Sequence, residues 1–146
     1  MKEASWNDCI YSNSAVKITP DKEKAKSLIE TAEDRIKFLI RSLNEKTANY
    51  IFEDYYSSIL ELAQALVLLD SYKVNNHVCL GFFLRDVLKK EDLFRLFDDC
   101  RYKRNSLVYY GKRMDFQTAK DAIEKAKRLM DKLKNTIDEK LENKKW

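Results

Sequence analysis

Apolar residues recur at helical spacing through three long segments of this chain. They fall three or four positions apart over about 20–43, 50–69 and 119–141. Residues at that spacing line up as one stripe along a helix, so each segment predicts an amphipathic α-helix. Thr19-Pro20-Asp21 has the composition of a helix start, and Asp115 or Thr118 is expected to cap the last helix.

Two shorter segments add further helices. Residues 77–89 are apolar nearly all round, which is typical of a buried helix, and residues 92–110 carry an apolar face that ends before Gly111. Residues 70–76 have the composition of a turn-like linker, and no segment alternates well enough to predict a strand. Short connections favour antiparallel neighbours, so we predict an all-α, up-and-down antiparallel bundle of four to five main helices.

The two ends of the chain complete a single predicted domain over residues 1–146. Residues 1–18 are too apolar for a free tail, and Trp6, Cys9 and Ile10 have i, i+3, i+4 spacing. We therefore expect a short helix docked on the bundle. The far end of the last helix, residues 135–146, is expected to project or fray.

Composition supports this outline. The 146 residues are 45% hydrophobic and 36% charged. Two glycines and one proline are too few to supply the tight turns of several hairpins, so the composition favours long helices. No window approaches the roughly 18 uninterrupted apolar residues of a membrane span, and the N-terminus has no signal-peptide core. We therefore expect a cytoplasmic protein with no membrane partner.

The cysteines and the single histidine give no sign of a metal site. Cys9, Cys79 and Cys100 are widely spaced without a CxxC pair, and a zinc site would need all three to converge with His77. We expect neither a metal nor a cofactor. Cys79 and Cys100 lie among apolar residues and are predicted to be small buried side chains, and few disulfides are expected in a cytosolic protein.

The candidate functional residues are concentrated in residues 101–111, whose sequence is Arg-Tyr-Lys-Arg-Asn-Ser-Leu-Val-Tyr-Tyr-Gly. A helical wheel places Arg104 in the middle of an apolar face, with Asn105 and Tyr109 at its edge. Arginine keeps its charge and is rarely buried without partners. Arg104 is therefore expected either to pair with a carboxylate, such as Asp70 or Asp86, or to point into a cleft.

The 28 basic and 24 acidic residues give a net charge of +4, which is too small for a dedicated nonspecific nucleic-acid binder. A local basic patch remains, and it is made of Arg101, Lys103, Arg104, Lys112 and Arg113.

The end of this helix resembles the terminal motif of HEPN domains, small helical proteins common in archaea and bacteria. That motif is an arginine, often followed by asparagine, and then a histidine four to six residues after the arginine. Here Arg104 and Asn105 match, and Tyr109 stands at the histidine position. Tyr55-Tyr56-Ser-Ser-Ile59 resembles the aromatic second helix of the family, and 76–84 resembles its histidine-led third helix. The resemblance covers about residues 20–135.

The resemblance implies a homodimer that acts on RNA. In active family members the arginine and histidine of two subunits meet across a dimer cleft and cleave RNA without metal. Here it implies that Arg104 binds phosphate, whereas a tyrosine with a pKa near 10 is a poor base at pH 7. Some members pair with small nucleotidyltransferases in toxin–antitoxin systems and carry a modified tyrosine, which here would be Tyr109 or Tyr110.

Three classes of function stay open. We prefer a nucleotide- or RNA-binding helical dimer with little or no catalysis. A metal-independent ribonuclease toxin would use Arg104 and Tyr109, or His77 if the fold brings that side chain near Arg104. The third class is an interaction module with a buried Arg104 ion pair. The predicted phosphate-binding residues are Arg101, Arg104, Asn105, Tyr109, Tyr110 and Lys112.

Overall fold

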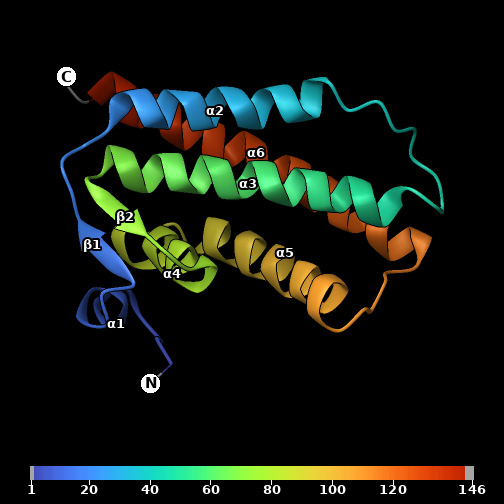
Figure 1. Cartoon of the computed structure of the whole chain (residues 1–146), viewed down its shortest axis with the longest axis horizontal. Helices are drawn as coiled ribbons and strands as arrows, with labels where there is room; N and C mark the ends of the chain where they lie inside the picture. The colour runs from blue at the N-terminus through green and yellow to red at the C-terminus, as the bar shows by residue number, and fades with distance from the viewer. Residues whose placement is uncertain (1, 144–146) are drawn as a thin grey trace.

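The computed structural model describes residues 2–143 and shows an all-α fold with one small sheet (Figure 1). In chain order the elements are α1 (Trp6–Tyr11), β1 (Ala15–Lys17), α2 (Lys22–Lys37), α3 (Ala48–Leu69), β2 (Tyr72–Val74), α4 (His77–Phe82), the π-helical turn η1 (Phe83–Val87), α5 (Glu91–Tyr109) and α6 (Phe116–Asn143). Within the described residues, no helix is both long enough and apolar enough to cross a membrane.

The long helices form the predicted up-and-down bundle. Successive helices α2, α3, α5 and α6 alternate in direction along the long axis (Figure 1). α3 lies centrally and packs against both α2 and α6. Its side chains are buried on nearly every face, and Phe52, Tyr56 and Ile59 are among the largest that are fully enclosed. Burial of this kind is the main stabilising contribution to such a bundle.

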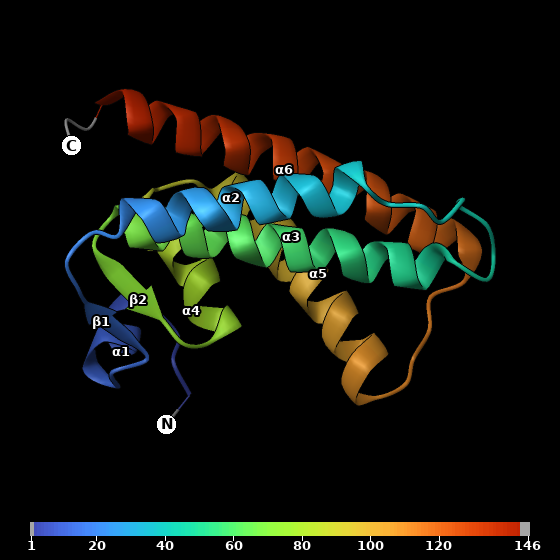
Figure 2. The same ribbon diagram turned by 45° about the horizontal axis from the view of Figure 1, so that its top comes forward.

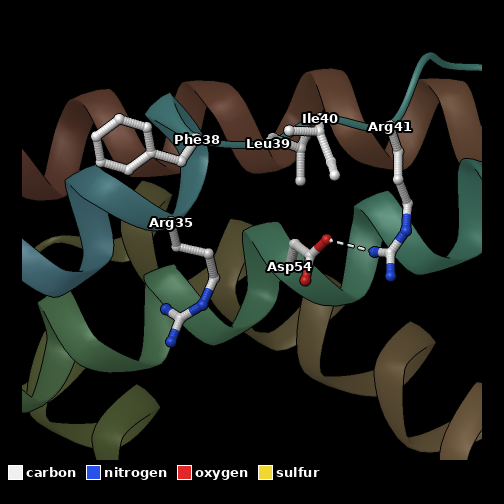
Figure 3. Close-up of a pocket in the computed structure, with 6 residues that line it drawn as sticks. All are labelled: Arg35, Phe38, Leu39, Ile40, Arg41 and Asp54. Carbon is white, nitrogen blue, oxygen red and sulfur yellow. Dashed lines mark hydrogen bonds and ion pairs between the residues drawn. The ribbon is translucent and has the colours of Figure 1, made fainter.

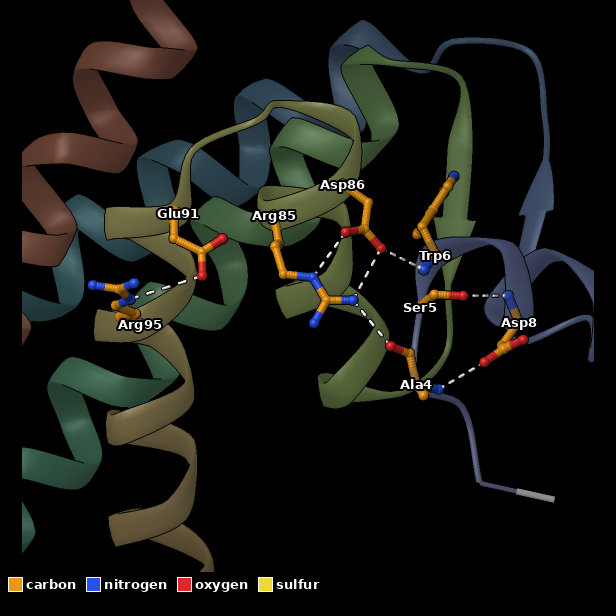
Figure 4. Close-up of polar contacts among 8 residues, drawn as sticks. All are labelled: Ala4, Ser5, Trp6, Asp8, Arg85, Asp86, Glu91 and Arg95. Carbon is orange, nitrogen blue, oxygen red and sulfur yellow. Dashed lines mark hydrogen bonds and ion pairs between the residues drawn. The ribbon is translucent and has the colours of Figure 1, made fainter.

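The N-terminal segment docks as predicted, except for Met1, which lies outside the described residues. The Trp6 ring meets the rings of Tyr72 and Phe83 edge-on, with centroid separations of 5.2 and 5.4 Å. The Trp6 backbone N–H donates to the Asp86 carboxylate at 2.8 Å, and Arg85 donates to the Ala4 carbonyl at 2.9 Å (Figure 4). Apolar contact and hydrogen bonds thus hold α1 against α4 and η1.

A disulfide joins Cys9 of α1 to Cys79 of α4 across 70 positions of sequence. Cys79 is fully buried as predicted, although its sulfur is part of a disulfide where few disulfides were expected. The packing of α1 on α4 brings the two residues together, and no spacing along the chain reveals that contact. Cys100 is a free, buried cysteine as predicted, and burial raises the pKa of its thiol to about 12.

A two-stranded sheet corrects the prediction that the chain has no strand. β1 pairs antiparallel with β2, with Ala15 opposite Val74 and Lys17 opposite Tyr72. β2 lies inside the segment that composition assigned to a linker. Each strand has only three residues, which is too short for an alternating pattern to be recognised.

The structure shortens one predicted helix and lengthens another. α2 ends at Lys37 rather than near 43, and the apolar side chains of Ile40 and Leu43, which continued the predicted stripe, are exposed. Farther along the α2–α3 connection, the side chains of Asn44 and Thr47 bond to neighbouring backbone groups. α6 stays helical to Asn143, since Ile137 is buried, so the predicted fraying from 135 is wrong to that point. Residues 144–146 of that predicted tail lie outside the described residues.

We expect Cys9→Ala to lower the free energy of unfolding by about 4 kcal/mol, because the disulfide closes a loop of 70 positions and restricts the unfolded chain. Urea unfolding with and without reductant measures this. Reductant should destabilise the natural protein to the same extent and leave the variant unchanged. A natural protein that is fully reduced, by thiol titration, yet equally stable would contradict the expectation.

Candidate functional site

The C-terminal half of α5 leaves the core. Leu93, Phe97 and Cys100 are buried, whereas the residues after Cys100 are half-buried or exposed. Figure 2 shows this half of α5 leaning away from α3 and α6 toward its C-terminal end. Tyr109 and Tyr110 are 69% and 77% exposed, so the motif residues lie at the molecular surface.

Arg104 lies between two aromatic rings. Its guanidinium carbon is 5.7 Å from the ring centroid of Tyr56 in α3 and 5.8 Å from that of Tyr109. Both distances fall within the range at which a cation is attracted to the face of an aromatic ring. Tyr56 is fully buried and Tyr109 is exposed, so Arg104 spans the boundary between core and surface.

No carboxylate neutralises Arg104 within the part of the chain that the structure describes. The neighbouring cations are matched: Arg101 pairs with Asp98 at 2.9 Å and Lys103 with Asp99 at 2.7 Å. The two carboxylates suggested for Arg104 have other partners, because Asp86 pairs with Arg85 and Asp70 with Lys140. Among the described residues, the suggested ion pair of Arg104 is therefore not formed.

His77 also contacts Tyr56. The Asn76 side chain accepts a hydrogen bond from the Cys79 N–H at 2.8 Å and so starts α4 at His77. The His77 Nδ1 is 3.3 Å from the Tyr56 hydroxyl. One buried phenol thus touches the histidine and lies under the Arg104 guanidinium. We call these residues, His77, Tyr56, Arg104 and Tyr109, the Tyr56 cluster.

The electrostatics of the cluster follow from burial and from two arginines. Burial lowers the pKa of His77, and the positive charges of Arg104 and Arg101 lower it further. Burial raises the pKa of the Tyr56 hydroxyl well above its usual value, although the same two arginines oppose the shift. At neutral pH the imidazole is therefore neutral, and the phenol keeps its proton and can donate it to Nδ1.

The predicted site residues are only partly gathered. Arg104 and His77 both contact Tyr56, Tyr109 contacts Arg104, and the charge of Arg101 acts on the His77 imidazole. The other three lie along the end of α5: Asn105 is half-buried, and Tyr110 and Lys112 are exposed. Tyr56 was not singled out as a site residue. The signal that could have identified it is a tyrosine hydroxyl at a core position of the predicted 50–69 helix, because a buried hydroxyl needs a polar partner.

Chemically, the cluster offers an unneutralised cation, two aromatic faces and a neutral imidazole. Such a cation attracts an anion, and an exposed ring can stack on a base. Within residues 2–143 there is no group of three or more His, Cys, Asp or Glu side chains that could hold a metal ion. The chemistry that this cluster can offer is thus anion binding, stacking and proton exchange at one histidine.

We expect Arg104→Gln to raise the pKa of His77, because it removes a positive charge that disfavours the imidazolium. His77 is the only histidine, so its ring resonance can be followed by NMR without assignment. In the natural protein the midpoint should lie below the ordinary value of about 6.5. Arg128→Gln removes the same charge from an exposed position on α6 and should leave the midpoint unchanged.

The same shift predicts how stability depends on pH. The folded pKa of His77 is lower than the unfolded one, so the unfolded chain binds more protons. The contribution of His77 to stability is therefore present above about pH 6.5 and is lost as the pH falls through the folded pKa.

In the NMR titration, an identical His77 midpoint in the natural protein and in Arg104→Gln would contradict the arrangement described for the cluster.

Comparisons of the chain with protein-family models, with curated proteins and with solved structures gave no match. The resemblance to HEPN domains therefore rests on the motif residues and on the helix order alone.

Proposed function

We propose that this chain binds RNA or a nucleotide through Arg104 and the tyrosines around it, as a HEPN-type helical dimer with little or no catalysis. One observation carries the proposal: the Arg104 guanidinium lies between Tyr56 and Tyr109, and no carboxylate of the described residues pairs with it. A half-buried cation without a counter-charge is stabilised by a bound anion, and phosphate is the anion that the resemblance implies.

The exposed tyrosines favour a nucleotide over a simple anion. Tyr102, Tyr109 and Tyr110 are each about 70% exposed or more, and all three lie on the same helix end as Arg104. Aromatic side chains beside a basic surface are the usual means of binding single-stranded nucleic acid, since every base has a face that can stack. Lys112 adds an exposed positive charge just past the helix.

The dimer belongs to the same proposal. The apolar segment 77–89 is covered within one chain by Trp6 and by the Phe94 ring, which stacks on Phe82. Large apolar side chains stay exposed just after α2, at Phe38 and Ile40, and at the end of α5, at Val108 and the three tyrosines. A second copy related by two-fold symmetry that packs on Val108 would bring two Tyr56 clusters together across a cleft and leave the tyrosine rings open to the ligand.

A toxin–antitoxin role with a small nucleotidyltransferase partner follows from the family resemblance, and it fits the hydroxyl groups of Tyr109 and Tyr110 on exposed side chains. A cytoplasmic location, where RNA is encountered, is also part of the proposal. The Cys9–Cys79 disulfide is unusual for that compartment, where thiols are kept reduced.

A second candidate function is a metal-independent ribonuclease. The observation that favours it is the contact of His77 with Tyr56, which places an imidazole beside the Arg104 cation. His77 comes from α4 rather than from the motif helix, so it could supply the proton exchange that Tyr109 lacks. Its lowered pKa leaves it in the neutral form, which is the form that accepts a proton.

We expect Arg104→Gln to weaken binding of a fluorescent single-stranded RNA by about tenfold or more, because a charge-assisted phosphate contact is worth roughly 1.5–3 kcal/mol. Anisotropy at several salt concentrations measures this, and the slope of log affinity against log salt should fall by about 0.7. Arg128→Gln, with the same loss of charge, should bind as the natural protein does. Equal binding by the two variants would contradict the site.

We expect cleavage of RNA by the natural protein to be weak or absent at pH 7, and Tyr109→His to raise it. The histidine would add a group that exchanges protons near neutrality on the motif helix itself. Electrophoresis of labelled RNA after incubation in EDTA measures this. Robust cleavage by the natural protein, lost in Tyr109→Phe, would make Tyr109 a catalytic residue. Cleavage lost only in His77→Gln would favour the second candidate.

A further inference from the structure

A second cluster of cations and an aromatic ring includes a residue of the α5–α6 connection, which follows the motif helix directly. The Tyr50 ring, near the start of α3, is half-exposed. The guanidinium carbon of Arg113 is 5.4 Å from its centroid, and that of Arg41 is 5.8 Å from it. Tyr50 belongs to α3, Arg113 to the α5–α6 connection and Arg41 to the α2–α3 connection, so only the fold brings them together. We call them the Tyr50 cluster.

Hydrogen bonds hold the α5–α6 connection in place. The side chain of Asn49, which is almost fully buried, donates to the Met114 carbonyl and accepts from the Met114 N–H, both at 3.0 Å. The Lys112 N–H donates to the Ser106 carbonyl at 3.0 Å. Asp115 then caps α6 by accepting from the Thr118 N–H at 2.8 Å. Arg113 therefore extends from a backbone that is tied to α3 on one side and to α5 on the other.

The charges of the two clusters are alike. Arg41 pairs with Asp54 at 3.0 Å, at the edge of a shallow pocket that also includes Phe38 and Ile40 (Figure 3). Arg113, by contrast, has no carboxylate within 4.0 Å among the described residues. Each cluster thus combines a tyrosine ring with one arginine whose charge is unmatched, Arg104 in the first and Arg113 in the second. Exposed Lys112 lies between them in sequence.

The spacing of the clusters along the chain suits a short nucleic-acid strand. From Tyr109 to Arg113 is four residue steps, so their Cα atoms are at most about 14 Å apart. Bases stacked at about 3.4 Å per nucleotide cover that upper limit in about four nucleotides. An oligonucleotide of about four nucleotides is therefore long enough to extend from the one residue to the other.

We propose that one single-stranded RNA segment of about four nucleotides or more runs from the Tyr56 cluster past Lys112 to the Tyr50 cluster. This proposal rests on the proposed function and names its ligand as single-stranded RNA rather than a mononucleotide. Phosphates contact Arg104, Lys112 and Arg113. Bases stack on the exposed tyrosines of α5 at one end and on Tyr50, or on the guanidinium planes beside it, at the other.

The test compares uridine monophosphate with oligouridylates of two, four and eight nucleotides. Affinity should rise steeply between two and about four to six nucleotides, once both clusters are reached. The variant Tyr50→Ala with Arg113→Gln should bind the octamer about tenfold more weakly, since stacking alone contributes roughly 1–3 kcal/mol per base. The same variant should bind the mononucleotide as the natural protein does.

A matched control is Tyr11→Ala with Arg128→Gln. It removes one exposed tyrosine on α1 and one exposed arginine on α6, far in sequence from both clusters, and should leave binding at every length unchanged. Circular dichroism and thermal unfolding confirm that each variant is folded. Sedimentation of each variant records its oligomeric state.

The outcomes separate the two proposals. If Arg104→Gln weakens binding at every length but the Tyr50 and Arg113 variant binds the octamer normally, this inference is overturned and the proposed function stands. If neither variant changes any binding, both are overturned. If the Tyr50 and Arg113 variant turns a dimer into a monomer and RNA binding is unchanged, the Tyr50 cluster is a protein interface and the inference is again overturned.

Discussion

The candidate site depends on one buried tyrosine. Tyr56 is fully enclosed in the central helix α3, where burial raises the pKa of its hydroxyl and keeps the phenol neutral. Its hydroxyl lies against His77 of α4, and its ring lies under the Arg104 guanidinium of α5. Three helices therefore share one contact. Because a neutral ring attracts the arginine without cancelling its charge, Arg104 is held in place and remains able to bind an anion.

The N-terminal segment supports the same site from a distance. The disulfide joins α1 to Cys79, two positions after His77, and Trp6 packs against Phe83 just beyond. Together with the Asn76 cap, these contacts fix the start of α4 and so the position of the imidazole. Beyond the C-terminal end of α5, Asn49 fixes the connection that carries Arg113. The Tyr56 cluster and Arg113 thus both lie beside segments whose positions are set by long-range contacts.

Local sequence signals predicted the helices because each long helix carries its own apolar stripe. Arg104 could also be singled out, since a charge in the middle of an apolar face requires an explanation. The partners of Arg104 could not be predicted: Tyr56 is 48 positions away, and it has the apolar spacing of an ordinary core residue. The disulfide, the paired three-residue strands and the Tyr50 cluster are likewise contacts between distant segments. Such contacts produce no repeating pattern of residues in the sequence. The end of α2 was missed because the apolar pattern continues to Ile40 and Leu43, whose side chains the fold leaves exposed.

The central claim is that an anionic ligand occupies the space next to Arg104, and the single histidine reports on it directly. The measurement is the NMR titration of the His77 ring in the natural protein, with and without saturating octauridylate. A phosphate beside Arg104 offsets the positive charge that lowers the His77 pKa, so the account predicts that the midpoint rises when RNA is bound. A midpoint that does not move, while anisotropy shows the RNA to be bound, would place the ligand elsewhere and contradict the account.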